Sequence, residues 1–549
     1  MLFANAEATH MMGSDISYAC VSPGKYHLTI KVYRDCRGIP LNSPTINIFC
    51  GDNGVSQSSG ISYTRTGIKD ITPTCSGGTN PCDPQNTPAA EGIEEHTFEA
   101  DIDFNTSPYN SFIKNKCCRV YFSVEQCCRN GAITTINPGN LYTEVFLDIC
   151  KVPKGKCNTS PQLTTPPVAY LCCNQPYTFN NGASESVDGD SLGYALGNPL
   201  NAPATNESYT GSFNPYIPMT PYCPPNPGVI NCNPIPNAKP PRGFYFDKET
   251  GDIIFTPTKC DEVGVIVIVI TEYRKDSTGK WQLIGQTRRD MQMVVKQCAS
   301  NNPPQVFGQK NQNKFSVCEG NKLCFNIESK DEQFLPGQLR PDTTYLTWNN
   351  GIPGATFTIT NPTAREKIAQ FCWQTKVGDA RPNPYSFTVT AKDDNCPRPA
   401  VTVKGFNVVV LQRARALRKY EILDCGKFRF SAYNEDTVNY KGAYNYDWEI
   451  RDSTNKGIPL KHSLNRLDSF KFKRGGKYIM TFFITNTIGC GTQYTDTFII
   501  PPVLDVKLAF GKDTFVCEGD SFTVKPVIAY GVPRYTFKWE SPAGTFNPK

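Results

Sequence analysis

The amino-acid sequence predicts an all-β protein, built from disulfide-stapled β-sandwich domains in tandem that form an extended rod. Three observations support this. Segments rich in Val, Ile, Thr, Tyr and Phe recur about every ten residues, for example at 25–33, 265–273 and 402–411. Turn-forming residues separate them, and Pro (44) and Gly (42) are abundant among the 549 residues. The third observation is the 24 cysteines, which exported β domains use as staples.

The cysteines also predict export to an oxidising compartment. No C-x-x-C pair occurs and the four histidines are scattered, so zinc–thiolate sites lack their usual ligand spacing. Ala4-Asn5-Ala6 has the pattern of a signal-peptide cleavage site, and residues 1–6 are interpreted as the remnant of such a peptide. The longest apolar run, at 263–270, is too short to span a bilayer and predicts a buried strand, so no transmembrane segment is expected.

Repeated motifs and Pro-rich punctuation predict the domain boundaries. Phe315-Ser-Val-Cys318-Glu-Gly returns as Phe515-Val-Cys517-Glu-Gly, each near the start of a unit. The last unit stops about halfway through a sandwich, so the natural chain is expected to continue beyond Lys549. The predicted units are a Cys-rich β domain (7–158), a β domain with a Pro/Asn-rich insertion (159–300), two sandwiches (301–412 and 413–503) and the start of another repeat (504–549).

Three vicinal cysteine pairs occur, and two of them, Cys117-Cys118 and Cys127-Cys128, bracket the predicted strand 119–126. Because neighbouring strand residues face opposite sides, each pair is predicted to send one sulfur to each face rather than to bond to itself. The alternation places Cys118 and Cys128 on the core face and Cys117 and Cys127 on the other. A metal–thiolate cluster is the alternative. The connectivity stays open, with candidate partners Cys20, Cys36, Cys50, Cys75, Cys82, Cys150 and Cys157.

Downstream the cysteines are sparser. Cys425 opens one unit and Cys490 precedes its last strand, so the two are predicted to tie the ends of a sandwich. Cys372 and Cys396 flank the strand 385–391 in the same way and are predicted to pair. By the same reasoning Cys517 would find its partner beyond Lys549.

One acidic turn is a candidate metal site. Glu185, Asp188 and Asp190 lie in Ser184-Glu-Ser-Val-Asp-Gly-Asp-Ser191, and alternating carboxylates around a Gly resemble the oxygen-ligand loops that hold Ca²⁺. Asp247 and Asp252 are candidates for further ligands. The spacing is not that of an EF-hand, and a polar turn without metal is the alternative. Ca²⁺ at this turn is the one cofactor that the sequence suggests.

Catalytic and nucleic-acid-binding chemistry have little support. No nucleophile elbow, P-loop or H-E-x-x-H occurs. Asp393-Asp394, in a turn before Cys396, is predicted to shape that turn rather than to act as a glycosidase pair. The net charge of +6 is interleaved, and its densest basic patch, at 413–419, is interpreted as a solvated connector. The chain is therefore predicted to be neither an enzyme nor a nucleic-acid-binding protein.

Several motifs together carry a resemblance. Lys31-Val-Tyr-Arg-Asp-Cys36, Asp188-Gly-Asp-Ser-Leu-Gly-Tyr194 and Arg289-Asp290 before Cys298 resemble the N-terminal signature of very large Bacteroidota surface proteins. These are gliding-motility-associated adhesins of the SprB type, exported by the type IX secretion system. Tyr446-Asp-Trp448-Glu-Ile resembles a PKD domain. The resemblance implies a cadherin- or Ig-like domain at 159–300, Ig-like repeats at 301–412 and 504–549, and a PKD-like sandwich at 413–503.

The leading functional hypothesis is a non-catalytic cell-surface adhesin or fibre component, the N-terminal portion of a much larger protein of adhesion and gliding motility. The resemblance implies a location on the outer face of the outer membrane. It implies as partners other surface proteins or surface polysaccharide and the secretion and motility machinery, with filament assembly as a further option. The alternative is a set of accessory binding modules of a secreted hydrolase whose catalytic domain is absent from this chain.

Overall fold

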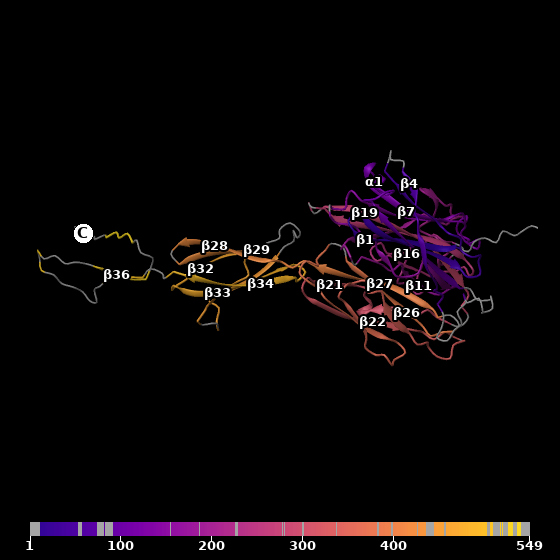
Figure 1. Ribbon diagram of the computed structural model, residues 1–549. Coiled ribbons are helices and arrows are strands. Elements are labelled where there is room, and N and C mark those ends of the chain that lie inside the picture. Colours follow the sequence, from indigo (N-terminus) through magenta and orange to yellow (C-terminus); the bar gives the residue numbers. More distant parts are fainter. Residues whose placement is uncertain are drawn as a thin grey trace, which may run out of the picture. The chain divides into compact units, whose positions relative to one another are not determined.

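The computed structural model confirms an all-β protein (Figure 1). Among the described residues, the helical elements are α1 (Asn110–Lys114) and the 3-10 turn η1 (Gln309–Asn311). The chain divides into two compact units, Met1–Lys376 with Arg381–Val410, and Val377–Ala380 with Leu411–Lys549. The predicted rod stays a prediction. The described residues are 11–52, 57–73, 82, 92–153, 155–185, 187–225, 229–276, 278, 280–298, 301–335, 337–381, 384–396, 399–424, 426–434, 444–454, 457–501, 505–508, 517, 519, 525–530 and 535–539.

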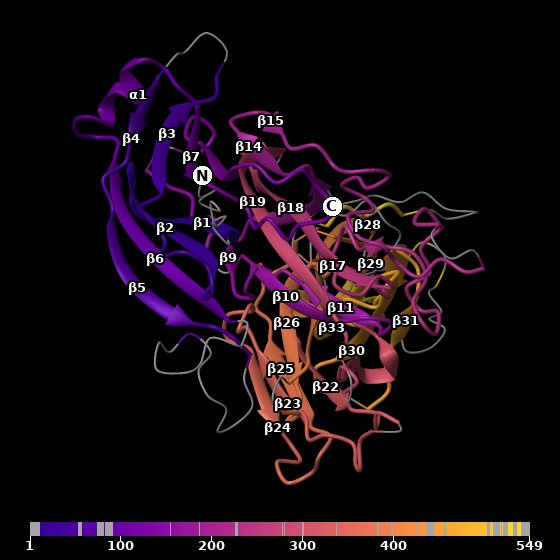
Figure 2. The ribbon, with the colours of Figure 1, turned by 90° about the vertical axis from the view of Figure 1, so that its right-hand side faces the viewer.

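One large sheet dominates the first unit. Its main path runs β4-β3-β7-β8-β19-β1-β2-β6-β5, and β10, β13, β14, β15 and β18 attach beside it. Figure 2 shows β5, β6, β2 and β1 side by side, followed by β19. The strands are β1 (Met11–Ser22), β2 (Lys25–Asp35), β3 (Thr45–Cys50), β4 (Ser58–Gly60), β5 (Thr64–Asp70), β6 (Ile93–Asp103), β7 (Arg119–Gln126), β8 (Leu141–Asp148), β10 (Val168–Cys172), β13 (Ser191–Gly197), β14 (Leu200–Ala202), β15 (Thr205–Asn206), β18 (Val263–Lys275) and β19 (Trp281–Lys296).

Strand β19 joins what the sequence predicts as two domains, because strands from 7–158 and from 159–300 share one sheet. β19 pairs along its length with its hairpin partner β18, and also with β1, β8 and β10. Ser14, for example, lies opposite Asp290. Local patterning predicts that a strand exists but not its distant partners. The partners of β19 in β1 lie at the opposite end of this part of the sequence.

The apolar run in β18 is buried on both faces, as the sequence predicts. Ile266, Ile268 and Ile270 pack into one core cluster, and the alternate residues Val265 and Val267 pack into another. Two small sheets cover the first of these clusters: β11 (Tyr177–Asn180), β17 (Asp252–Phe255) and β16 (Tyr245–Phe246), and the pair β9 (Gln162–Leu163) with β12 (Ala183–Ser184).

The rest of the first unit is a β-sandwich of two four-stranded sheets. Aromatic rings fill its interior: Phe371 of one sheet stacks on Phe387 of the other with ring centroids 4.5 Å apart, a contact typical of packed sheet faces. One sheet contains β20 (Gln305–Gly308), β22 (Lys322–Lys330), β25 (Ile368–Gln374) and β24 (Thr356–Ile359). The other contains β21 (Lys314–Cys318), β27 (Val401–Leu411), β26 (Tyr385–Lys392) and β23 (Tyr345–Trp348).

The second unit contains another sandwich and one further strand pair. Trp448 lies in its core, 1% exposed, and its indole Nε1 donates to the Asn465 carbonyl at 2.9 Å. One sheet contains β28 (Ala416–Asp424), β29 (Lys427–Asn434) and β32 (Leu467–Lys471). The other contains β31 (Lys461–Ser463), β30 (Tyr444–Asp452), β33 (Gly476–Asn486) and β34 (Gly491–Ile500), and the pair is β35 (Asp505–Leu508) with β36 (Pro526–Tyr530).

Disulfides tie the strand ends, and they correct part of the cysteine prediction. Cys117 bonds to Cys50 and Cys118 to Cys150, so this vicinal pair is split as predicted. The predicted faces are wrong, because Cys117 is the buried core residue. The pair precedes β7, which begins at Arg119, so strand alternation does not extend to it.

The pair Cys127-Cys128 bonds to itself, against the prediction. It follows β7, which ends at Gln126, so the alternation that would separate the two sulfurs has already stopped. The third vicinal pair is split, as predicted. Further bonds of the first unit are Cys20–Cys157, Cys36–Cys82, Cys172–Cys298, Cys173–Cys260 and Cys223–Cys232.

The downstream prediction is corrected at one bond. Cys372 pairs with Cys324, not with Cys396, because Cys324 and Cys372 are direct neighbours across the β22–β25 ladder. Cys396 is disulfide-bonded, as is the buried Cys490. The predicted partner of Cys490, Cys425, lies outside the described residues. Cys517 is a free, exposed thiol.

Candidate functional site

The motif residues that carry the family resemblance form buried ion pairs in the large sheet. Arg289 and Asp290 are neighbours on β19, and both are buried. The Arg289 guanidinium donates to both carboxylate oxygens of Asp15 at 3.0 Å. Asp290 accepts two hydrogen bonds at 2.7 Å from Arg129, which also donates to the Leu200 carbonyl at 3.0 Å. These residues therefore brace strands against one another.

The second motif, in β2, extends this bracing. The Tyr33 hydroxyl lies 3.2 Å from carboxylate oxygens of both Asp15 and Glu95. Arg34 donates to Glu94 at 2.6 and 3.1 Å. Burial raises the pKa of Asp15, and the Arg289 guanidinium opposes that rise. The motif residues described here hold β1, β2, β6 and β19 together.

The predicted calcium turn is closed by one of its own carboxylates. Glu185 Oε1 accepts the backbone N–H groups of Val187 at 2.8 Å and Asp188 at 2.7 Å. Glu185 is 8% exposed, and burial raises its pKa to about 7. An oxygen that closes a turn in this way is already used by the backbone.

The other two predicted ligands are paired with Arg274 of β18. Asp190 accepts bonds at 2.6 Å from Arg274 Nε and Nη2. Asp188 lies 3.3 Å from Arg274 Nη2 and accepts the N–H of Thr159 at 2.6 Å. The guanidinium therefore occupies the position between the carboxylates where a cation would neutralise them.

The structure brings Glu185 and Asp190 together with a third carboxylate, Glu272, and leaves Asp188 out of this group. Glu272 is fully buried on β18, and burial raises its pKa well above the usual range. Sequence reasoning missed Glu272 and Arg274, and the available signal was the charged residues at the end of an otherwise apolar strand. Calcium at this turn stays a prediction, and arginine already supplies positive charge there.

The two additional candidates serve other contacts. Asp252 is buried and accepts hydrogen bonds from Asn180 Nδ2 at 2.5 Å and from the Gly405 N–H at 3.0 Å. Burial raises its pKa to about 6. Asp247 accepts the N–H of Glu249 at 2.8 Å within its own turn. Asp252 therefore holds the sandwich against the rest of the first unit.

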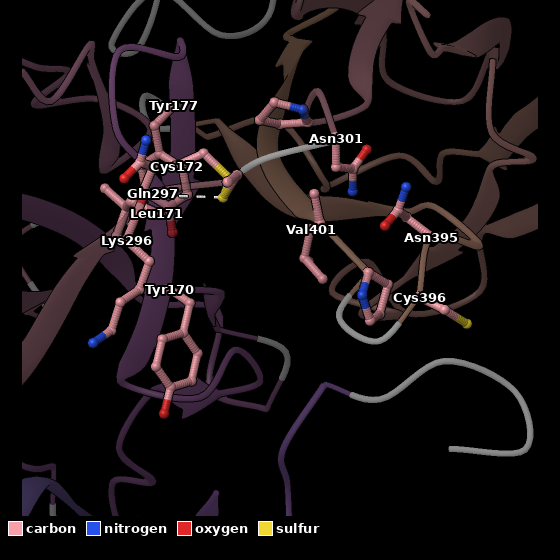
Figure 3. Close-up of a pocket in the computed structure, with 14 residues that line it drawn as sticks. Tyr170, Leu171, Cys172, Tyr177, Lys296, Gln297, Asn301, Asn395, Cys396 and Val401 are labelled. Atoms are coloured by element: carbon pink, nitrogen blue, oxygen red, sulfur yellow. Dashed lines mark hydrogen bonds between the residues drawn. A yellow bond between two sulfur atoms is a disulfide. The ribbon is translucent and has the colours of Figure 1, made fainter. Parts of the chain in front are cut away.

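A cavity of about 330 Å³ lies where the sandwich meets the large sheet (Figure 3). Tyr170, Tyr177 and Lys296 line it from one side, and Asn395 and Val401 from the other. The wall also includes Asn301, in the segment that connects β19 to β20. Figure 3 shows the amides of Asn301 and Asn395 turned toward one another.

A second acidic cluster lies beside this cavity, and sequence reasoning did not assemble it. Asp331 follows β22, Asp342 precedes β23 and Asp393 follows β26. One carboxylate oxygen of each lies within 4.8 Å of those of the other two, and the residues are 2%, 6% and 1% exposed. β22 belongs to one sheet of the sandwich and β23 and β26 to the other. The cluster therefore joins the two sheets.

Hydrogen bonds account for part of this cluster. Asp393 Oδ1 accepts the N–H groups of Asn395 at 3.2 Å and Ala400 at 2.9 Å, so it shapes the turn as the sequence predicts. Its Oδ2 accepts from Asn301 Nδ2 at 2.8 Å. Asp342 Oδ2 accepts from Asn395 Nδ2 at 3.0 Å. Burial raises the pKa of Asp331 to about 7 and that of Asp393 to about 6.

The histidines of the described residues show no catalytic arrangement. Each has a ring nitrogen near a carboxylate: His27 at 2.8 Å from Asp101, His96 at 3.1 Å from Glu94 and His462 at 2.8 Å from Asp447. His10 lies outside the described residues. Nor does any described helix have the length and apolarity that crossing a membrane requires.

Comparisons with known proteins identify no family. No family model and no curated protein matches the chain. Solved structures with similar folds include domains A168–A170 of titin (10% identity, 62% of this chain, 99% of that chain, TM-score 0.24). The four N-terminal Ig domains of Dscam1 isoform 6.44 match at 9% identity (88% and 98% covered, TM-score 0.20). Drosophila N-cadherin EC1-4 matches at 13% identity (84% and 93% covered, TM-score 0.20). Scores this low carry no functional argument.

Proposed function

We propose that this chain is a non-catalytic structural part of a secreted cell-surface adhesin or fibre. The observation that carries the proposal is the set of disulfides between distant strand ends. Cys20–Cys157 and Cys172–Cys298 join residues 137 and 126 positions apart. Cross-links over such long loops disfavour the unfolded chain and require an oxidising compartment. Domains stapled in this way suit a surface exposed to shear and proteases.

The finer proposal is an adhesin of the gliding-motility type. It is supported by the motif residues, which the large sheet uses as buried ion pairs rather than leaving them on the surface. On this proposal the chain is exported by the type IX system and displayed on the outer face of the outer membrane. It works there as an extended array, alone or in a filament, against surface polysaccharide or other surface proteins.

Localisation on intact cells tests the proposal first. Antibodies to the purified chain should label non-permeabilised cells of the source bacterium, and their Fab fragments should reduce attachment to a solid surface. Fab fragments against an abundant unrelated surface protein serve as the control. Labelling that requires permeabilised cells would contradict a surface role.

Adhesion by the purified chain tests it second. Beads coated with the oxidised chain should stay on a polysaccharide-coated surface under flow. Beads coated with the reduced and alkylated chain should detach, because the sandwiches lose their staples. Equal retention of both bead types would argue against the folded domains as the adhesive element. Release of soluble sugar by the oxidised chain would contradict the non-catalytic role.

A further inference from the structure

Two buried oxygen atoms at the aspartate cluster lack a hydrogen-bond partner among the described residues. They are Oδ2 of Asp331 and Oδ1 of Asn301. Asn301 is not one of the acids, and it is only 6% exposed. Its Nδ2 donates to Asp393, and its backbone carbonyl accepts from Gln175 at 2.7 Å. The Asn301 amide therefore contacts the cluster through Nδ2, and its oxygen is a buried acceptor without a partner in the described part of the chain, which is unfavourable without a positive partner.

We propose that Asp331, Asp342, Asp393 and Asn301 bind one divalent cation of the calcium class at this end of the sandwich. An ion among them would bond the two unpaired oxygens. It would also neutralise carboxylates that burial and mutual repulsion otherwise destabilise.

This cluster differs from the one at Glu185 in the positive groups that neutralise its carboxylates. There, the Arg274 guanidinium is bonded to Asp190 through two short hydrogen bonds. At the aspartate cluster the ion pairs within the described residues come from Arg340, whose side chain is 51% exposed. Its closest approach to Asp342 is 3.9 Å, and solvent screens so exposed a charge. Among the described residues, no ion pair from a group of comparable burial therefore balances the negative charge of the buried cluster.

The ligand atoms select the class of ion. The proposed site offers carboxylate and amide oxygens, which hard cations prefer. Its four residues supply no imidazole nitrogen and no thiolate sulfur as a metal ligand. Ca²⁺ accepts six to eight oxygens in flexible geometry, whereas Mg²⁺ demands a near-octahedral shell. Three carboxylates from separate loops and one linker amide fit the flexible requirement better.

Binding would fix the linker on the sandwich. Asn301 lies between Cys298, which follows β19, and Gln305, where β20 begins. Its contacts reach both sides, because Gln175 belongs to the large-sheet side and Asp393 to the sandwich. The ion would therefore lock this junction of the first unit.

Calcium titration of the full chain tests the proposal. Calorimetry with CaCl2, after chelator treatment, should show saturable binding, and MgCl2 should bind more weakly. At a calcium concentration about 100-fold above the Kd, the unfolding equilibrium constant should fall about 100-fold. Asp331→Asn should weaken binding by about 100-fold or more, whereas Glu185→Gln, at the arginine-paired cluster, should leave the affinity unchanged. Absence of binding, or full binding by Asp331→Asn, would overturn the proposal.

A gain-of-function variant guards against misfolding as an explanation. Asn301→Asp adds a fourth carboxylate, so the melting temperature should fall without calcium and should rise more with calcium than that of the unaltered chain. Circular dichroism checks that each variant is folded. An Asn301→Asp protein whose melting is indifferent to calcium would also overturn the assignment.

Discussion

The ion pair between Arg129 and Asp290 yields the sharpest stability prediction. Their side chains are 2% and 5% exposed and share two hydrogen bonds of 2.7 Å. Arg129→Met would leave the Asp290 carboxylate buried and unpaired, which is expected to cost about 3–5 kcal/mol of unfolding free energy. The double variant Arg129→Met/Asp290→Leu removes both charges and is expected to lie within about 2 kcal/mol of the unaltered chain. Arg129 Nε is buried without a hydrogen-bond partner in the described part of the chain, so the guanidinium is incompletely satisfied and its removal together with Asp290 is expected to cost little.

Equilibrium urea unfolding of the oxidised chain measures these differences, with fluorescence and circular dichroism followed in parallel. Lys31→Met serves as the matched control, because Lys31 is 37% exposed in its pair with Glu95. It should cost less than about 1 kcal/mol. A double variant as unstable as Arg129→Met, or less stable, would refute the argument that the unpaired carboxylate is the source of the loss.

Three further predictions concern titration and thiol chemistry. Burial raises the pKa of Asp252 to about 6 in the folded chain, whereas it is about 3.9 in the unfolded chain. The contribution of Asp252 to the unfolding free energy should therefore be complete below about pH 4 and should be lost as pH rises through about 6. Asp252→Asn should remove about 3 kcal/mol of that pH dependence in urea titrations. Cys172→Ser/Cys298→Ser should lower the unfolding free energy by about 4–5 kcal/mol; an unchanged midpoint would contradict the loop argument. Cys517→Ser should remove one equivalent of maleimide labelling from the native chain, as mass spectrometry would show.

Much of the fold was predictable because local patterns determine whether a strand forms. The continuous apolar run in β18 and the alternation in β7 are recovered as strands with buried faces. The partners of β19 were not predictable, since pairing with β1 depends on contacts more than 250 residues away in sequence (Gly13 with Met291). The same limit explains the cysteine errors. Alternation holds within β7 but not for Cys127 and Cys128, which follow its last residue.

The candidate sites show the same division. Glu185 and Asp190 were recognisable because they share one turn, but Glu272 comes from a strand far along the chain. Asp331, Asp342 and Asp393 had no common sequence signature. They meet only because the loops after β22 and β26 and before β23 lie at one end of the sandwich. Asp393 could be placed in a turn from the sequence, but its neighbours could not.

The two acidic clusters have the same size and burial, and the difference between them lies in what neutralises the charge. A guanidinium that donates two hydrogen bonds of 2.6 Å to Asp190 is a permanent counter-charge supplied by the chain itself. At Asp331 the chain supplies oxygens that have no partner among the described residues, one of them from the linker residue Asn301. A turn that looks like a calcium loop in sequence can therefore be an arginine-paired brace. Conversely, the oxygens best arranged for an ion come from residues without a shared motif. The rigidity of this junction would then depend on the calcium around it, whereas the disulfides and buried ion pairs of the large sheet hold regardless of it.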